Sequence, residues 1–191
     1  MSTPKVESRP DGVAEVLVVL AAGGSSRMGQ PKALMPVGDV PLLRLHIDRA
    51  LTAGLQSWVV LGFRPDAHAA VLPQGVRIVY NPAWASTDMS TSAWLALETL
   101  GAAPCLLTPV DVPPARPEVL RRLSGLPGDV VPTFDGLDGH PVRLAPPHVP
   151  GRLDLRLARA RRVMIEDPTC VYNLNTPEDW RRWQGGPPAE R

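Results

Sequence analysis

The feature that most constrains this sequence is an apolar run that ends in a glycine-rich turn. Residues 13–20, VAEVLVVL, are apolar apart from Glu15, and they lead directly into LAAGGSSRMGQPKAL, residues 20–34. Such a run is typical of a strand covered on both faces, as in a parallel sheet, rather than of a strand with one solvent face. The glycines, serines and basic residues that follow therefore stand at the carboxyl end of a buried strand.

Later apolar runs repeat this pattern, with helical patterns between them. The predicted strands are residues 57–62, 76–80 and 104–110, and the predicted helices are residues 40–54 and 89–101. The apolar residues that share one face of these two helices are Leu43, Ile47, Ala50 and Leu51 in the first and Ala93, Leu97 and Leu100 in the second. Gly54 and Gly101 are placed to end them.

The alternation of strands and helices predicts an α/β fold with right-handed crossovers. We expect a three-layer α/β/α sandwich whose central sheet is mostly parallel. In such a sheet, ligands bind beyond the carboxyl ends of the strands. The segments at those ends are residues 21–32, 81–92 and 109–113, which locates a binding site before any motif is considered.

The chain after residue 113 has a less regular pattern. Short strands are predicted at residues 129–132 and 140–144, followed by a helix at 152–162, a strand at 163–167 and a helix at 176–183 with Thr176 as its N-cap. With 191 residues the chain is long enough to enclose the core of one domain. We expect a flexible N-terminus over residues 1–11, one domain over residues 12–184 and a disordered tail over residues 185–191.

The composition argues against several classes of protein. Apolar residues make up 44% of the chain and the formal net charge is +1, which favours neither disorder nor a surface for nucleic acid or membrane. Cys105 and Cys170 have no metal-ligand spacing and do not resemble a disulfide framework. Residues 1–11 lack the apolar segment of a signal peptide, and no run of about 18 apolar residues is present to span a bilayer. We therefore expect a soluble, cytoplasmic protein.

The glycine-rich loop offers the groups that bind phosphate. Backbone N–H groups of such a turn can converge on phosphate oxygens, and Arg27 and Lys32 can neutralise the phosphate charge. Lys5 is the only other lysine in the chain. A Walker loop is excluded because Gln30 and Pro31 separate the last glycine from the lysine, and the loop has no Rossmann Gly-x-Gly-x-x-Gly. The alternative interpretation is a strand-to-helix turn with exposed basic residues.

The segment LAAGGSSRMGQPKAL resembles the signature of the nucleotidyltransferases related to molybdenum cofactor cytidylyl- and guanylyltransferases, Leu-Ala-(Ala/Gly)-Gly-x-(Ser/Gly)-x-Arg-Met-Gly-x-x-Lys. The resemblance continues in NPAWASTDMSTS, TPVDVP, GHPV and NLNTPEDW, and so extends from about residue 16 to residue 183. It implies a Rossmann-like nucleotidyltransferase fold. It also implies a Mg²⁺-dependent reaction that transfers a nucleoside monophosphate from a nucleoside triphosphate to a phosphorylated acceptor and releases pyrophosphate.

The resemblance assigns roles to the glycine-rich loop. The residues that border the base and ribose are Leu20, Ala21, Ala22, Gly23 and Gly24. The residues that wrap the triphosphate are Ser25, Ser26, Arg27 and Gly29. Lys32 then reaches the α- and β-phosphates as a compact positive charge. Arg27, Lys32 and Asp111 form the implied catalytic set, because phosphoryl transfer of this kind needs positioning and charge neutralisation rather than a covalent nucleophile.

Asp111 and Asn175 are the implied metal ligands. Asp111 lies in TPVDVP, which resembles the family's metal-binding turn, and Mg²⁺ favours one or two carboxylates together with phosphate oxygens. Its alternative role is to cap a following helix. Asn175 stands where cytidylyl members often have aspartate and guanylyl members tend to have asparagine. Its amide oxygen can still bind a metal, with Asn173 as another candidate and turn hydrogen bonding as the competing explanation.

The segment NPAWASTDMSTS resembles the family's second loop, near the base and the acceptor. The candidate binding residues in it are Asn81, Trp84, Ser90 and Ser92. The competing interpretation is an Asn-Pro turn, ordinary helix caps and a tryptophan of the core. Asp88 replaces a residue that is often glycine, and its charge would repel phosphate if it pointed inward. His140 in GHPV is either an acceptor contact or a structural hydrogen-bonding histidine.

The base and the acceptor are less constrained than the reaction. Ala22 matches the LAAG of cytidylyl members, whereas Asn175 matches the guanylyl type, and we favour CTP. The chain lacks the Gly-Asp-x-Gly-Ala-Arg segment that usually follows GHPV in cytidylyl members. The arginines found in that part of the chain are Arg156, Arg159, Arg161 and Arg162, which either bind an anionic acceptor or lie solvated on a helix. A molybdopterin-like phosphate is the default acceptor.

Other functions stay open from the sequence. One is the same chemistry with GTP, or with a sugar or polyol phosphate as acceptor. Another is a non-catalytic carrier that delivers molybdenum cofactor to a molybdoenzyme or its chaperone, although Arg27, Lys32 and Asp111 argue for catalysis. A redox enzyme has the least support, because the chain carries no dinucleotide fingerprint.

Overall fold

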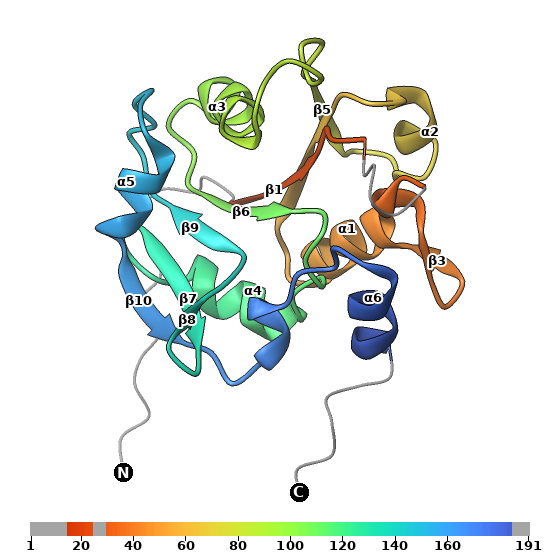
Figure 1. The fold of residues 1–191 in the computed structure, drawn as a ribbon. Coiled ribbons are helices and arrows are strands. Elements are labelled where there is room, and N and C mark those ends of the chain that lie inside the picture. Colours follow the sequence, from red (N-terminus) through yellow and green to blue (C-terminus); the bar gives the residue numbers. More distant parts are fainter. Residues whose placement is uncertain (1–14, 25–29, 185–191) are drawn as a thin grey trace, which may run out of the picture.

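A computed structural model describes residues 15–24 and 30–184 of the chain (Figure 1). The expectations for residues 1–11 and 185–191, and those for Ser25, Ser26, Arg27 and Gly29, lie outside these described residues. Within them, one sheet of eight strands has the order β10-β7-β9-β6-β1-β4-β5, and β8 pairs with β7. The strands of this sheet are β1 (Val16–Ala21), β4 (Gln56–Leu61), β5 (Arg77–Tyr80), β6 (Cys105–Pro109), β7 (Val130–Phe134), β8 (Leu137–Asp138), β9 (Val142–Leu144) and β10 (Arg161–Met164).

The apolar run at the start of the chain forms the central strand. Every residue of β1 is buried, and β1 pairs in parallel with both β4 and β6, so that Val16 lies opposite Gln56 on one side and Cys105 on the other. β4 pairs in parallel with β5, and β10 with β7. β9 runs antiparallel between β6 and β7. The expected α/β fold is therefore confirmed, as a mixed sheet with a parallel core.

Helices and short 3-10 turns connect the strands. They are η2 (Lys32–Leu34), α1 (Leu42–Thr52), α2 (Pro65–Ala69), α3 (Met89–Leu100), α4 (Pro117–Ser124), α5 (Leu153–Ala158), η3 (Pro168–Val171) and α6 (Pro177–Gln184). A small hairpin of β2 (Pro36–Val37) and β3 (Val40–Pro41) precedes α1. None of the helices within residues 15–24 and 30–184 is long and apolar enough to cross a membrane.

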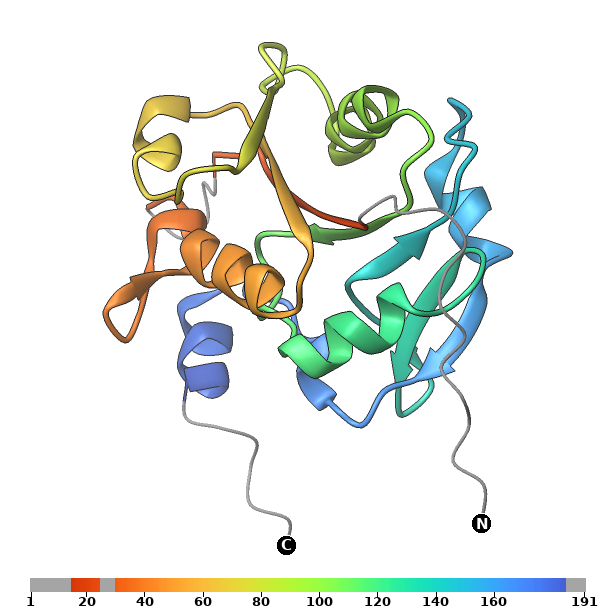
Figure 2. The same cartoon turned by 180° about the vertical axis from the view of Figure 1, so that it is seen from behind.

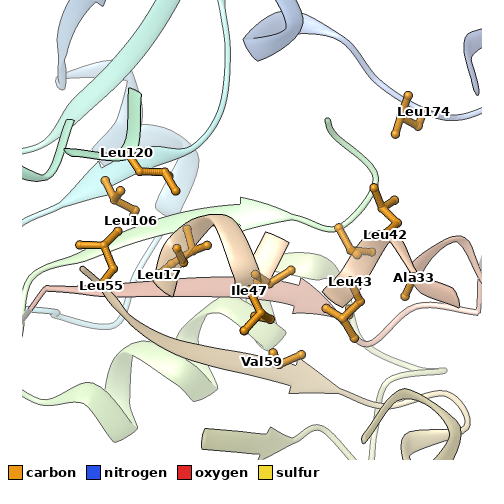
Figure 3. Close-up of a cluster of buried hydrophobic side chains, with 14 of the residues drawn as sticks. Leu17, Ala33, Leu42, Leu43, Ile47, Leu55, Val59, Leu106, Leu120 and Leu174 are labelled. Atoms are coloured by element: carbon orange, nitrogen blue, oxygen red, sulfur yellow. The ribbon is translucent and has the colours of Figure 1, made fainter. Parts of the chain in front are cut away.

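Two hydrophobic clusters on opposite faces of the sheet make the three layers (Figures 1 and 2). Side chains of a strand alternate between faces. Leu17 and Val19 of β1 accordingly pack with α1, α4 and α6, whereas Val16 and Val18 pack with α3 and α5. In Figure 3, Leu17, Val59 and Leu106 of the strands lie near Ile47 of α1 and Leu120 of α4.

Two details of the expected pattern are wrong. Leu51 is 48% exposed, because the sheet covers only the side of α1 that carries Leu43, His46, Ile47 and Ala50. The helix expected over residues 152–162 ends at Ala158, and Arg161 and Arg162 belong to β10 instead.

Arg162 explains why that helix stops early. Its guanidinium donates hydrogen bonds to the carbonyl oxygens of Leu157, Ala158 and Ala160 at 2.9 Å, and so satisfies carbonyls at the end of α5. The Arg161 N–H donates to the Asp129 carbonyl oxygen at 3.0 Å, which starts the pairing of β10 with β7.

Candidate functional site

The three segments at the carboxyl ends of the predicted strands meet at one cleft. Its volume is about 290 Å³, close to the lower end of the usual range for small-molecule pockets of ~300–1,000 Å³. The lining residues are Leu20, Ala22, Gly23, Lys32, Trp84, Thr87, Asp88, Met89, Ser92, Pro109, Val110 and Asp111. They come from the carboxyl ends of β1 and β6 and from the segments that follow β1, β5 and β6, including the start of α3. These are the segments that the sequence singled out, extended by Leu20 at the end of β1.

Lys32, Asp111 and Asn175 come together beside this cleft. The Lys32 Nζ donates hydrogen bonds to Asp111 Oδ2 at 3.1 Å and to Asn175 Oδ1 at 2.9 Å. The Lys32 side chain is 8% exposed and that of Asp111 is 35% exposed. A positive charge is thus held between a carboxylate and an amide oxygen in a partly buried position.

The backbone fixes the two oxygen-bearing residues relative to each other. The Val110 N–H donates to the Leu20 carbonyl oxygen at 3.0 Å, which extends the pairing of β6 with β1 as far as the turn before Asp111. The Leu174 N–H donates to the Asp111 carbonyl oxygen at 2.7 Å. Because Leu174 is fully buried in the same cluster as Leu42 (Figure 3), the segment that carries Asn175 is anchored to the core.

The start of α6 holds Asn175 from the other side. The Asp179 carboxylate accepts hydrogen bonds from the N–H groups of Asn175 at 3.1 Å and Thr176 at 2.8 Å, and the Asp179 N–H donates to Thr176 Oγ1 at 3.1 Å. These reciprocal bonds resemble a capping box and confirm Thr176 as the helix cap. Hydrogen bonds from Thr176 hold the pKa of Asp179 below its usual value.

The donor set fits a divalent metal that is shared with a phosphate ligand. A carboxylate and an amide oxygen are hard ligands of the kind Mg²⁺ takes, and here they already enclose a cation, the Lys32 ammonium. In the part of the chain that the structure describes, no group of three or more His, Cys, Asp or Glu residues could form a cage by itself. Phosphate oxygens and water would therefore complete the coordination.

An aromatic pair forms one wall of the site. Trp84 lines the cleft, and its ring meets Phe63 edge to face with the centroids 5.2 Å apart. The Phe63 N–H donates to the Ala22 carbonyl oxygen at 2.9 Å. A side chain at Gly24 would touch both rings at 3.6 Å. Trp84 is thus a wall of the cleft and also packs against the core cluster under α3. Phe63 is a supporting residue that the sequence did not point to, although it directly follows the predicted strand at residues 57–62.

Asn81 organises the second loop from inside. It is 1% exposed, its Nδ2 donates to Thr87 Oγ1 at 3.1 Å and Ser92 Oγ at 3.0 Å, and its Oδ1 accepts from the Ala83 N–H at 3.0 Å. Ser92 lines the cleft, whereas Ser90 is exposed and lies outside the lining. Asn81 therefore holds this loop and the start of α3 in position and does not itself line the cleft.

Asp88 lies in the cleft lining and caps α3. Its Oδ1 accepts a hydrogen bond from the Thr91 N–H at 2.9 Å, and this bond lowers the pKa of the exposed carboxyl. Its charge is therefore tied to the start of the helix.

His140 and Ala21 do not belong to the cleft lining. Burial lowers the pKa of the His140 imidazole, and the backbone N–H of His140 donates to the Cys170 carbonyl oxygen at 2.8 Å. The Ala21 side chain belongs to the core cluster under α1, on the other side of the sheet from Leu20 and Ala22.

The four arginines that the sequence offered as acceptor contacts are Arg156, Arg159, Arg161 and Arg162, and two of them form ion pairs within the protein. Arg156 binds the Asp129 carboxylate through two hydrogen bonds of 2.7 Å, and Arg162 binds Asp138 at 2.7 Å. Arg159 and Arg161 are exposed. None of the four lines the cleft.

Comparison with known proteins decides the family. Residues 17–170 match the sequence profile of the MobA-like NTP transferase domain. The chain belongs to the MobA-like NTP transferase family. The family resemblance seen in the sequence is thereby confirmed.

Relatives of both nucleotide types resemble this MobA-like NTP transferase. The molybdenum cofactor cytidylyltransferase of Escherichia coli (strain K12) is 28% identical over 85% of this chain and 92% of its own length. The molybdenum cofactor guanylyltransferase of Xanthomonas euvesicatoria pv. vesicatoria (strain 85-10) is 30% identical over 86% of this chain and 92% of its own length. The identities are so similar that the choice of base rests on the residues of the cleft.

Solved structures share the fold of this MobA-like NTP transferase. A nucleotidyl transferase from Methanothermobacter thermautotroptrophicus superposes with a TM-score of 0.75 and 25% identity, covering 91% of this chain and 97% of that one. A manganese complex of a Mycobacterium tuberculosis H37Rv protein gives a TM-score of 0.69 and 24% identity, covering 91% and 99% of the two chains.

Proposed function

We propose that this chain is a Mg²⁺-dependent nucleotidyltransferase that moves a nucleoside monophosphate, CMP in preference to GMP, from its triphosphate to the phosphate of molybdopterin or molybdenum cofactor. Pyrophosphate is the second product. The observation that carries the proposal is the meeting of Lys32, Asp111 and Asn175 beside the cleft at the carboxyl end of β1. The relatives with this activity on molybdenum cofactor support the choice of acceptor.

The reaction itself is an in-line substitution at phosphorus. An oxygen of the acceptor phosphate attacks the α-phosphorus, the bond to the bridging oxygen of the β-phosphate breaks, and pyrophosphate leaves with that oxygen. Such a reaction depends on alignment and on neutralising charge on the phosphates. A bound Mg²⁺ supplies Lewis-acid polarisation of the phosphate oxygens.

The residues of this chain bind the metal, the phosphates and the base. Asp111 and Asn175 hold the metal, and Lys32 neutralises the charge of the α- and β-phosphates. Ala22 and Gly23 border the base and ribose, and Trp84 lies near the base and the acceptor. Their place in the cleft lining supports these roles. Arg27, Ser25, Ser26 and Gly29, which the sequence alone assigns, wrap the triphosphate.

The lining of the cleft favours cytosine over guanine. The Ala22 side chain lies in the lining of the cleft, where a glycine would leave more room for a purine edge. Asn175 favours GTP instead, because guanylyl members tend to have asparagine at this position. In the structure its amide oxygen accepts a hydrogen bond from Lys32.

The decisive experiment measures pyrophosphate after incubation with each nucleoside triphosphate, Mg²⁺ and molybdopterin. We expect release that depends on both CTP and the acceptor. Release with GTP alone would reverse the base assignment, and release only with a sugar or polyol phosphate would replace the acceptor. Tight binding of molybdenum cofactor without any release would favour the carrier function over catalysis.

Asp111→Asn tests the metal role without changing the size of the side chain. We expect at least a 100-fold loss of acceptor-dependent pyrophosphate release, because charge stabilisation of this kind typically contributes factors of about 10² to 10³. Asp48→Asn is the matched control, since Asp48 pairs with Arg44 on α1 at 2.7 Å, away from the cleft lining. Full activity of Asp111→Asn would contradict the assignment.

Both proposed substrates are small phosphorylated molecules, so we propose a cytoplasmic enzyme with no nucleic-acid or membrane partner. We assign the catalytic domain to residues 12–184. A molybdoenzyme or its chaperone is the class of protein that would receive the product.

A further inference from the structure

The Lys32 ammonium lies where the two proposed metal ligands converge. It is 3.1 Å from Asp111 Oδ2 and 2.9 Å from Asn175 Oδ1, and the sequence resemblance had placed this lysine on the phosphates instead. One cation therefore already fills the space between the oxygens that a second cation would need.

The oxygens are fixed, whereas the cation between them is on a flexible stem. Asp111 and Asn175 are held by the bonds from Val110 to Leu20 and from Leu174 to Asp111, and by the capped start of α6. None of these bonds involves the Lys32 side chain. Ala33, 2% exposed, anchors the η2 backbone in the core, but four methylene groups separate the Lys32 ammonium from that backbone.

We propose that Lys32 acts as a built-in counter-ion that keeps the Asp111–Asn175 site closed to free divalent metal and opens it when a nucleoside triphosphate arrives. This inference rests on the proposed function. The polyphosphate supplies new negative oxygens for the ammonium, so Lys32 can leave Asp111 without losing its charge partner. The same event leaves the carboxylate and amide oxygens available to the metal.

Such an exchange links the two ligands energetically. Metal bound alone would sit against the positive charge of Lys32, and at separations of a few ångströms this repulsion is large in a partly buried site. Nucleotide removes the repulsion, so nucleotide and metal must strengthen each other's binding by the same factor. The chain would thereby avoid holding metal in a site that lacks its substrate.

Metal binding in the absence of nucleotide tests the inference directly. We would titrate the full chain with Mn²⁺, following free Mn²⁺ by electron paramagnetic resonance, in the wild type and in Lys32→Met. Methionine keeps much of the length of the stem and removes the charge. We expect Lys32→Met to bind Mn²⁺ at least about tenfold more tightly than the wild type. Equal affinities would overturn the proposal.

Three further variants identify the cause of any gain. Arg44→Met removes a positive charge from the Asp48 pair on α1 and should leave Mn²⁺ affinity unchanged. Lys32→Arg keeps the charge and should stay as weak as the wild type; a gain equal to that of Lys32→Met would overturn a charge mechanism. Adding Asp111→Asn to Lys32→Met should abolish the gain, and a persistent gain would place the metal elsewhere and also overturn the proposal.

Repeating the Mn²⁺ titration with CTP present measures how strongly nucleotide binding and metal binding are linked. CTP should raise the Mn²⁺ affinity of the wild type by a larger factor than that of Lys32→Met, and equal factors would contradict the exchange. This result is separate from the transferase activity. If Lys32→Met binds Mn²⁺ more tightly but no wild-type mixture releases pyrophosphate, the counter-ion role of Lys32 stands and the transferase activity is rejected. If Mn²⁺ binding is unchanged in Lys32→Met but the wild type releases pyrophosphate normally, the transferase activity stands and the counter-ion role is rejected.

Discussion

At the scale of the residue, Gly62 shapes the cleft because it has no Cβ. A Cβ at this position would lie 2.5 Å from the Trp84 Cβ and 2.8 Å from the Ala22 carbonyl oxygen. Real Cβ atoms do not approach so closely, so Trp84 reaches its place against Phe63 only because position 62 has no side chain. The aromatic wall and the backbone at Ala22 thus depend on one glycine directly after β4.

Gly62→Ala should push Trp84 and the Ala22 backbone apart. We expect a loss of about 1–3 kcal/mol in the free energy of unfolding, which is typical of overpacking, together with weaker binding of CTP. Urea unfolding and a CTP titration measure the two effects. Gly151→Ala is the control, because a Cβ there has nothing within 4 Å; equal stability of the two variants would show that Trp84 adjusts at no cost.

At the scale of the element, α3 begins at the cleft with a negative charge in its cap. Asp88 accepts a hydrogen bond from the Thr91 N–H at 2.9 Å, which satisfies one N–H of the first turn. A carboxylate at this end also complements the helix dipole. The same carboxylate lies in the lining of a cleft that we propose to bind a triphosphate, so helix stability and ligand charge oppose each other at this position.

Substitutions of Asp88 should separate these two effects. Asp88→Asn keeps a capping oxygen and removes the charge, and we expect it to bind CTP about twofold to fivefold more tightly at unchanged stability. Asp88→Ala should show the same gain in affinity with a lower melting temperature. Calorimetric titration and thermal unfolding provide the measurements. Unchanged CTP affinity in both variants would mean that the Asp88 charge is not felt by the nucleotide.

At the scale of the whole molecule, His46 connects α1 to the turn that carries Asp111. It is 2% exposed on the core side of α1, and burial lowers its pKa from 6.5 to about 4. The positive charge of Arg49 works in the same direction, while the charge of Asp111 works against it. Its place among the buried residues Leu42, Leu43, Ile47 and Ala50 follows the helical period.

The depressed pKa of His46 predicts acid sensitivity of the fold. Between pH 6.5 and about pH 4 the unfolded chain binds a proton that the folded chain rejects, so stability rises with pH in this window. The contribution of His46 to stability is fully present above pH 6.5, declines as the pH falls through this window, and is lost below about pH 4. A shift of this size corresponds to at most about 3 kcal/mol.

Urea unfolding at several pH values measures this dependence. We expect His46→Leu to flatten the decline between pH 6.5 and about 4, whatever its effect at neutral pH. Burial lowers the pKa of His140 as well, so His140→Asn should remove part of the remaining slope. An unaltered slope in His46→Leu would show that His46 is not protonated on unfolding.

Much of the architecture could be predicted because it depends on short-range patterns. The apolar run at residues 13–20 predicted a strand covered on both faces, and the carboxyl-end rule predicted which loops meet. The limits of α5 and the exposure of Leu51 could not be read in this way. They depend on Arg162 capping the helix and on how much of α1 the sheet covers.

The sequence by itself determined the parallel core, the place of the cleft and the residue types beside it, because burial, chain direction and glycine-rich turns are local properties. Only the tertiary structure decided that the Lys32 ammonium lies between Asp111 and Asn175. These residues are 79 and 143 positions away from Lys32 along the chain. Their contact depends on the packing of η2, the turn after β6 and the start of α6 around one core, and such packing has no periodic signal in the sequence.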